Sequence, residues 1–197
     1  MKRQLSPSEP PAAECLVALG ANQTLGGRSL RESLDFAFAS LADAGLDPVA
    51  RSGLYRTPAY PPGAGPDFLN AAARIVTDLP PDQVLERLHR IEAALGRERH
   101  VRWAARTLDL DLLAMGDRVL PDRDTFRAWA DMPPARRGTE APDRLILPHP
   151  RLHERGFVLI PLAEVAPDWR HPVLGRTVAQ MCAALPAEAT SGIERVA

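Results

Sequence analysis

The sequence predicts an α+β fold with a ferredoxin-like β-α-β-β-α-β core, in which a mainly antiparallel sheet packs its helices on one face and extra helices follow at the C-terminal end. Two observations lead to this fold class. Short apolar or alternating segments are interleaved with two segments whose apolar residues recur every three or four positions. The length of 197 residues suits one domain with tails.

The strand predictions rest on short runs with period two or continuous apolar character. ECLVALG is a short buried run that ends at Gly20, and TLDLDLLAM alternates cleanly. Strands are expected over 14–20, 48–57, 68–77 and 107–115. The segment 58–66, PAYPPGAGP, contains four prolines and two glycines, which predicts a kinked loop.

The first helix is expected over 27–44, where leucines and a phenylalanine recur at spacings of four, four and three. Ser29 followed by Glu32 predicts a capping box. A second amphipathic helix is expected over 82–95, preceded by two prolines and stopped by Gly96.

The remaining segments are shorter or more polar. A short helix around 126–130 lies inside a polar excursion, 117–142, that resembles an insertion, and LILPHP at 145–150 predicts a short strand or turn. Helices are expected over 156–167, with Pro161 in the first turn, and over 176–184. The predicted limits are a disordered tail at 1–13, one domain over 14–185, and a C-terminal tail at 186–197 that frays.

The composition excludes several classes of protein. The net charge of −1 argues against a surface built for nucleic acid or anionic membranes. Cys15 and Cys182 have no metal or disulfide-scaffold spacing, and no segment resembles a signal peptide or membrane helix, so a cytoplasmic protein is expected. The only lysine is Lys2, so arginine must handle any phosphate; the alternative is a genomic bias towards arginine.

An acidic pair offers the first candidate site. Asp109 and Asp111 share one face of the 107–115 strand, with Cα atoms about 6–7 Å apart. Their mutual repulsion would be relieved by a divalent cation or a pair of cations. The alternative is a plain strand with acidic residues facing solvent.

The segment before this strand is basic. Arg97, Arg99, Arg102 and Arg106 precede the acidic pair, a combination suited to metal-bound polyphosphate. The alternative is a solvated basic loop, in which Trp103 either stacks on a flat ligand or pins the loop. The glycine-rich stretch 20–29 is not a P-loop, because its spacing fails and Arg28 stands where lysine is needed.

Three further features carry weaker signals. Asn70 in DFLN could bond a heterocycle edge, and His149 in LPHP could contact phosphate, but the residues alone favour a structural role for each. His89 and Glu92 share a helix face without further metal ligands at a matching spacing.

Three segments resemble a known family. YRTPAYPPGAGPDFLNAAARI, HRIEAALGRERHVRWAARTLDLDLL and LILPHPRLHERGFVLIPLAEVAP, in this order, are similar to the 6-hydroxymethyl-7,8-dihydropterin pyrophosphokinase family from Leu16 to about Ala183. The resemblance implies a ferredoxin-like α+β enzyme of folate biosynthesis. Such an enzyme transfers pyrophosphate from ATP to the pterin hydroxymethyl group and releases AMP, with two Mg²⁺ ions.

The resemblance also implies roles for individual residues. The implied catalytic residues are Arg97, Arg106, Asp109 and Asp111, the last two also holding Mg²⁺. The implied pterin site comprises Thr57, Pro58, Ala59, Tyr60, Phe68, Asn70, Trp103 and Phe157, with Phe68 and Phe157 on either side of the ring. The implied ATP contacts are His89, Glu92, Arg99, Arg102, Leu112, Arg144, Ile146, His149 and Arg155.

Two other functions are weighed against this one. A ferredoxin-like RNA-binding module would use the arginine loop, but its stacking strand would need aromatic residues, whereas TLDLDLLAM is acidic and has none. A ligand-sensing domain without catalysis would not need the acidic pair. The expected partners are small molecules, ATP and the pterin, with no nucleic acid or membrane, and the expected oligomeric state is a monomer.

Overall fold

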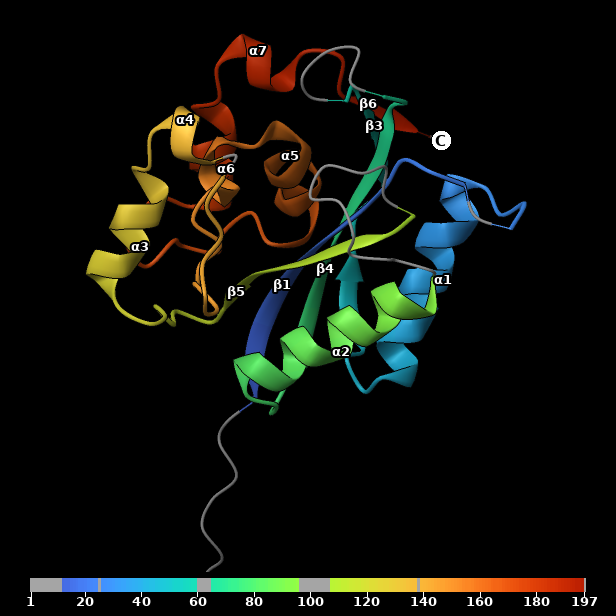
Figure 1. The fold of residues 1–197 in the computed structure, drawn as a ribbon, viewed down its shortest axis with the longest axis horizontal. Helices are drawn as coiled ribbons and strands as arrows, with labels where there is room; N and C mark the ends of the chain where they lie inside the picture. The colour runs from blue at the N-terminus through green and yellow to red at the C-terminus, as the bar shows by residue number, and fades with distance from the viewer. Residues whose placement is uncertain (1–11, 25, 60–64, 96–106, 138, 197) are drawn as a thin grey trace, which may run out of the picture.

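The strand segments assemble into one antiparallel sheet. A computed structural model describes residues 12–24, 26–59, 65–95, 107–137 and 139–196. The sheet has the order β5-β1-β4-β3-β6, and β2 also pairs with β4 (Figure 1). Its strands are β1 (Ala13–Ala21), β2 (Pro48–Arg51), β3 (Leu54–Thr57), β4 (Phe68–Thr77), β5 (Asp109–Met115) and β6 (Glu194–Val196).

The two amphipathic helices cover one face of the sheet, as predicted. They are α1 (Leu30–Asp43) and α2 (Pro81–Ala94), and their buried apolar residues join those of alternate strand positions such as Val17 and Leu110 in the larger core cluster. The capping box of Ser29 and Glu32 is present at the start of α1. Each helix therefore begins where its local sequence signal places it.

The C-terminal helices cover the opposite face (Figure 1). They are α5 (Gly156–Val165), which follows a short 3₁₀ turn, and α6 (Val178–Ala183). The predicted place of Pro161 in the first turn of α5 is wrong, because Pro161 is the sixth residue of the helix. The almost wholly apolar helix is buried between the sheet and α6, so tertiary packing outweighs the missing backbone donor. The predicted excursion 117–142 contains α3 (Arg123–Ala130) and α4 (Pro134–Arg137).

Two further predictions differ from the structure. The segment predicted as one strand over 48–57 is divided into β2 and β3, because the ladder with β4 is interrupted at Ser52, whose hydroxyl accepts the Ala72 N–H (2.8 Å). The predicted fraying after Pro186 is wrong, because α7 (Ala187–Thr190) and β6 follow, and β6 pairs with β3. No helix among the described residues is long and apolar enough to cross a membrane.

Candidate functional site

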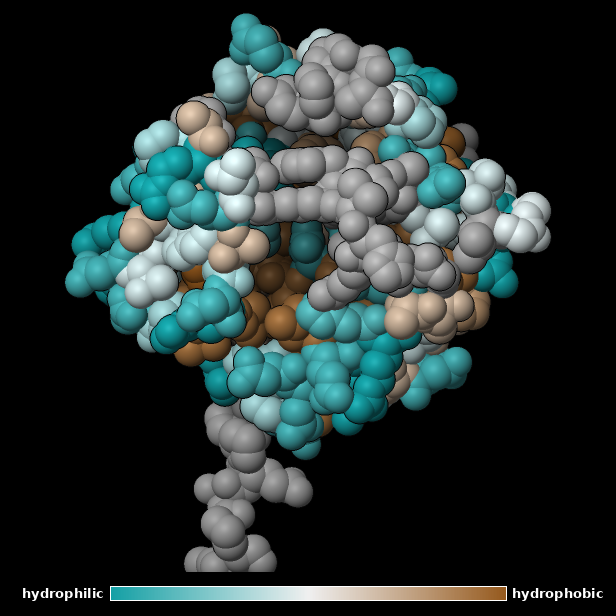
Figure 2. Space-filling view, viewed as in Figure 1, coloured by the Kyte–Doolittle hydropathy of each residue, from teal (hydrophilic) through white to brown (hydrophobic). Residues whose placement is uncertain are grey.

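The acidic pair lies on the face of β5 that α1 and α2 leave uncovered. Asp109 and Asp111 are half-exposed, whereas Leu110 and Leu112 between and beside them are buried in the core under α2. This alternation is the one that the TLDLDLLAM pattern predicts. Figure 2 shows hydrophobic side chains in a hollow in the middle of the view, where β5 and β1 run in Figure 1, with hydrophilic side chains around them.

A row of residues crosses the sheet from the acidic pair. In the strand register, Asp109 pairs with Gly20, Gly20 with Asn70, and Asn70 with Tyr55. Directly paired residues of antiparallel strands project from the same face. Asp109 and Asn70 therefore share one face, separated by a residue that has no side chain.

The position of the Asn70 side chain requires a glycine at residue 20. A Cβ built on Gly20 would lie 2.8 Å from the Oδ1 atom of Asn70. Asn70 is buried, and its Nδ2 donates to the hydroxyl of Thr57 (2.7 Å), which is also buried. The amide of Asn70 is thus fixed in orientation between β1 and β3, as recognition of a heterocycle edge requires.

The start of α5 faces the acidic pair from above the sheet. The guanidinium of Arg155 lies 4.0 Å from the carboxylate of Asp111 and also over the ring of Phe157, 5.6 Å from its centroid. Burial lowers the pKa of Arg155 and the charge of Asp111 opposes this, but the group stays protonated at neutral pH. Phe157 is exposed even with Arg155 over its ring, so part of the ring is accessible to a ligand.

Two hydrogen bonds, one from its backbone and one to its ring, hold His149 beside β5. Its N–H donates to the carbonyl of Leu113 (2.7 Å), and its Nδ1 accepts the N–H of Arg151 (3.2 Å). Burial, reinforced by the charges of Arg155 and Arg151, lowers the pKa of His149 to about 3. The ring is therefore neutral at physiological pH and carries its proton on Nε2, as a hydrogen-bond donor for a phosphate oxygen would.

The other predicted ATP residues lie in different surroundings. Glu92 on α2 is buried, and its Oε1 accepts the N–H of Leu110 (2.8 Å) at the open edge of β5. His89, one turn earlier, is half-buried. The side chains of Leu112 and Ile146 are buried. Arg144 is exposed, and its described contacts are with Asp143 (3.1 Å) rather than with the acidic pair.

The remaining predicted residues divide into two groups. Thr57, Ala59 and Asn70 are buried, Phe68 is half-buried and Pro58 is exposed, and these five lie on β3, on β4 or directly after β3. Tyr60, Arg97, Arg99, Arg102, Trp103 and Arg106 lie outside the described residues.

The acidic pair fits magnesium in the chemistry of its donors. Mg²⁺ is commonly held by one or two carboxylates together with substrate phosphates and water. Asp109 and Asp111 supply two half-exposed carboxylates, and the described residues contain no group of three or more metal-ligating side chains. This set suits a metal that arrives with phosphate rather than a closed structural site.

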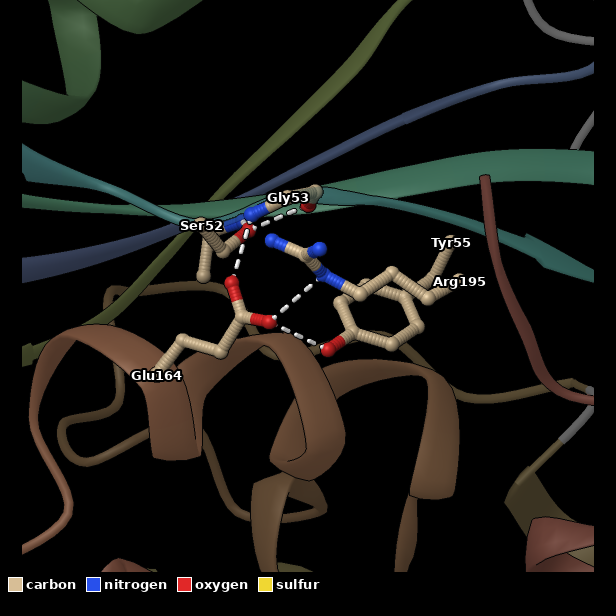
Figure 3. A network of polar contacts seen from close by, with 6 residues as sticks. Ser52, Gly53, Tyr55, Glu164 and Arg195 are labelled. Carbon is tan, nitrogen blue, oxygen red and sulfur yellow. Dashed lines mark hydrogen bonds and ion pairs between the residues drawn. The ribbon is translucent and has the colours of Figure 1, made fainter. Parts of the chain in front are cut away.

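A polar cluster that lies next to the site was not predicted from the sequence. The carboxylate of Glu164 on α5 accepts hydrogen bonds from the Gly53 N–H (2.6 Å), the Tyr55 hydroxyl (2.6 Å) and the Arg195 Nε (3.0 Å) (Figure 3). Glu164 and Tyr55 are 109 residues apart, so no local pattern could have paired them.

Comparison with protein families shows which family the chain belongs to. The model of the family described as 7,8-dihydro-6-hydroxymethylpterin-pyrophosphokinase (HPPK) matches residues 16–167. The chain belongs to this family. The HPPK match contains the acidic pair, Asn70, His149 and the start of α5, but it ends before the segment that forms α6, α7 and β6.

Individual HPPK relatives agree. The chain is 42% identical over 155 residues to a 2-amino-4-hydroxy-6-hydroxymethyldihydropteridine pyrophosphokinase of Methylorubrum extorquens, covering 79% of this chain and 82% of the relative. It is 39% identical over 180 residues to the Pseudomonas aeruginosa protein of the same name, covering 91% of this chain and 94% of that one.

Solved structures show the same fold at lower identity. A Plasmodium falciparum HPPK-DHPS structure matches 96% of this chain with a TM-score of 0.65 at 13% identity. This chain spans 47% of that longer chain, so the comparison bears on the fold alone. It agrees with the α+β class and the antiparallel sheet predicted from the sequence.

Proposed function

We propose that this protein is an ATP-dependent pyrophosphokinase of folate biosynthesis. It transfers the terminal pyrophosphoryl group of ATP to the hydroxymethyl group of 6-hydroxymethyl-7,8-dihydropterin, and the products are the pterin diphosphate and AMP. The observation that carries the proposal is the row in which Asp109 and Asn70 share one face across Gly20, within a chain of the HPPK family.

The pterin binds at the Asn70 end of the row. The fixed amide of Asn70 and the backbone around Thr57, Pro58, Ala59 and Tyr60 recognise the polar edges of the ring. Phe68 and Phe157 cover its faces, and Trp103 is a further proposed contact of the ring. Aromatic faces favour a flat heterocycle through stacking and burial of apolar surface.

The triphosphate binds at the Asp109 end. Asp109 and Asp111 would hold Mg²⁺, which when bound offsets phosphate charge and polarises the attacked phosphorus. His149 donates from Nε2 and Arg155 supplies a fixed positive charge, while Arg97 and Arg106 stabilise charge that develops on the departing AMP. His89, Glu92, Arg99, Arg102, Leu112, Arg144 and Ile146 complete the proposed ATP contacts.

The reaction then needs positioning more than acid–base chemistry. The pterin hydroxymethyl oxygen attacks the β-phosphorus in line and loses its proton to solvent as the new P–O bond forms. The bond between the β-phosphorus and the oxygen that bridges to the α-phosphorus breaks, and AMP leaves with that oxygen. Holding both substrates on one sheet face supplies the main part of the rate enhancement. We also propose that the enzyme acts as a monomer in the cytoplasm and that residues 14–185 contain its substrate sites.

The test is nucleotide analysis after mixing the protein with Mg²⁺, ATP and 6-hydroxymethyl-7,8-dihydropterin. AMP should form only when both the pterin and Mg²⁺ are present. ADP in place of AMP would contradict pyrophosphoryl transfer. An absence of turnover together with an absence of pterin binding would contradict the proposed substrate.

A further inference from the structure

The C-terminal segment spans two walls of the proposed pterin site. Residues 186–196, which we call the C-terminal strap, comprise α7 and β6. They follow α6 and end as a strand beside β3, so they run between the region of α5 and the edge of the sheet (Figure 1). The family match ends at residue 167, so the strap lies outside it.

The first contact of the strap is with the start of α5. A Cβ built on Gly156 would lie 1.9 Å from the carbonyl oxygen of Ala189 and 3.1 Å from Cδ1 of Ile193. Gly156 stands between Arg155 and Phe157. The strap therefore rests directly on the backbone that presents the proposed phosphate and ring contacts of α5.

The second contact is with the end of β3. A Cβ on Gly192, whose φ is +71°, would lie 2.8 Å from Cγ of Pro58. Beyond it, β6 pairs with β3, with Tyr55 opposite Arg195, and Arg56 forms an ion pair with Glu194 (2.5 Å). The strap thus packs against the strand that carries Thr57 and leads into the other side of the pterin site.

The third contact joins all three parts. Glu164 of α5 accepts hydrogen bonds from Tyr55 of β3 and from Arg195 of β6 (Figure 3). Gly53 leaves room for this arrangement, since a Cβ there would lie 2.7 Å from Nε of Arg195. One carboxylate therefore ties helix, sheet and strap together, next to the residue that pairs with Asn70.

We propose that the C-terminal strap sets the separation between the start of α5 and the end of β3, and that Gly156, Glu164, Tyr55 and Arg195 are positioning residues for the pterin. This proposal rests on the proposed function. The strap touches the backbone beside Phe157 and the strand that carries Thr57, so its larger effect falls on pterin binding. A shift of α5 at Gly156 would also move Arg155, so a smaller effect on ATP binding is expected there. A shift of about 1 Å between the walls of a site can lower its efficiency by a hundredfold.

The test compares Gly156→Ala and Tyr55→Phe with the unmodified full chain. The KM for the pterin should rise about tenfold or more in Gly156→Ala and by a smaller factor in Tyr55→Phe. In Tyr55→Phe the KM for ATP and kcat should each stay within about twofold. In Gly156→Ala the KM for ATP should rise by a smaller factor than the KM for the pterin, because Arg155 shares the displaced backbone. Alanine is the better helix former at position 156, so helix propensity alone predicts no loss. Glu188→Gln, an exposed change on α7 of the same strap, is the matched control and should match the unmodified protein.

A double-mutant cycle separates positioning from general destabilisation. In a chain that stops after Pro186, the pterin KM should already be raised, and adding Gly156→Ala should change it by less than about twofold, because the contact with Ala189 is gone. If the shortened chain does not fold, the two full-length variants decide.

The outcomes distinguish the two proposals. Equal losses for pterin and ATP, or an unchanged pterin KM in Gly156→Ala, would overturn the role of the strap while AMP formation by the unmodified chain upholds the function. If the unmodified chain forms no AMP and binds no pterin, both proposals fall.

Discussion

At the scale of single residues, the tightest constraint in the site is the approach of Asn70 to the backbone of Gly20. The Oδ1 atom occupies the space that any Cβ would need, and Nδ2 is bonded to Thr57. The sequence alone left Asn70 open to a structural reading, because nothing local shows that its amide is fixed by residues 50 and 13 positions away. The role of Gly20 becomes visible only once β1 and β4 are paired.

Gly20→Ala should therefore weaken pterin binding. The added methyl group displaces the amide of Asn70, so the pterin KM is expected to rise about tenfold, while the KM for ATP changes little. Steady-state kinetics with each substrate varied in turn measures both. In an Asn70→Ala background the same change should cost almost nothing, and a full additional loss there would contradict this explanation.

The acidic pair gives a second prediction at this scale. Asp109→Asn and Asp111→Asn keep the shape of the side chains but remove the charges that would hold Mg²⁺, so kcat should fall by at least about 100-fold in each. Asp117→Asn, an exposed change just after β5, is the control and should be active. Far-ultraviolet circular dichroism checks the fold. Near-normal turnover in both aspartate variants would disprove the metal assignment.

At the scale of secondary-structure elements, the features that depend on nearby residues were predicted correctly, and the features that depend on distant residues were missed. The capping box of Ser29 and the alternation of β5 depend on neighbours within four residues, and both were predicted. The break at Ser52 and the strand β6 depend on partners 20 or more residues away, Ala72 and β3, and both were missed. The sequence predicted a fraying tail over 186–197, although β6 within it pairs with β3.

Glu92 on α2 has a structural contact in addition to the ATP contact that the family resemblance implies. Its buried carboxylate accepts the N–H of Leu110 at the edge of β5, and this supports the strand of the acidic pair from the α2 side. Glu92→Gln keeps an acceptor, so its free energy of unfolding should stay close to that of the unmodified protein. Glu92→Leu leaves the donor unpaired and should lose about 1–3 kcal/mol in urea denaturation.

The ATP affinity of the same variants separates the two roles of Glu92. A structural role predicts that Glu92→Gln binds ATP normally. A loss of ATP affinity in Glu92→Gln at unchanged stability would instead support the direct contact implied by the family resemblance.

At the scale of the whole molecule, two clusters of apolar residues sit on opposite faces of one sheet, and the site lies on the face that α5 covers. The fold class and the β-α-β-β-α-β order of elements along the chain followed from the sequence, apart from the division of the 48–57 strand into β2 and β3. The covering of the second face did not, because α5 is apolar nearly all round and offers no period from which its orientation could be read.

The hydrogen bonds of Glu164, which connect α5 with the sheet, make the stability of the protein dependent on pH. Partial burial raises the pKa of Glu164, but the hydrogen bonds from Tyr55 and Gly53 and the charge of Arg195 outweigh it, so the pKa lies below the ordinary value of 4.5. A carboxyl with a lowered pKa contributes stability above its unfolded pKa and loses it as the pH falls through the folded pKa. The melting temperature of Glu164→Gln should therefore lie below that of the unmodified protein at pH 7, and the two should converge below pH 4.5. A constant difference down to pH 3 would contradict this linkage.

The place of β6 has a practical consequence for anyone who attaches a tag or reporter to this protein. A purification tag added after Ala197 would begin two residues beyond Val196, the last residue of the strand that pairs with β3, and its bulk or charge would weaken that pairing. The first strand instead begins at Ala13, seven residues and about 23 Å along β1 from Gly20. Labels, surface tethers and fused reporters attached at the N-terminal end would thus leave substrate binding undisturbed.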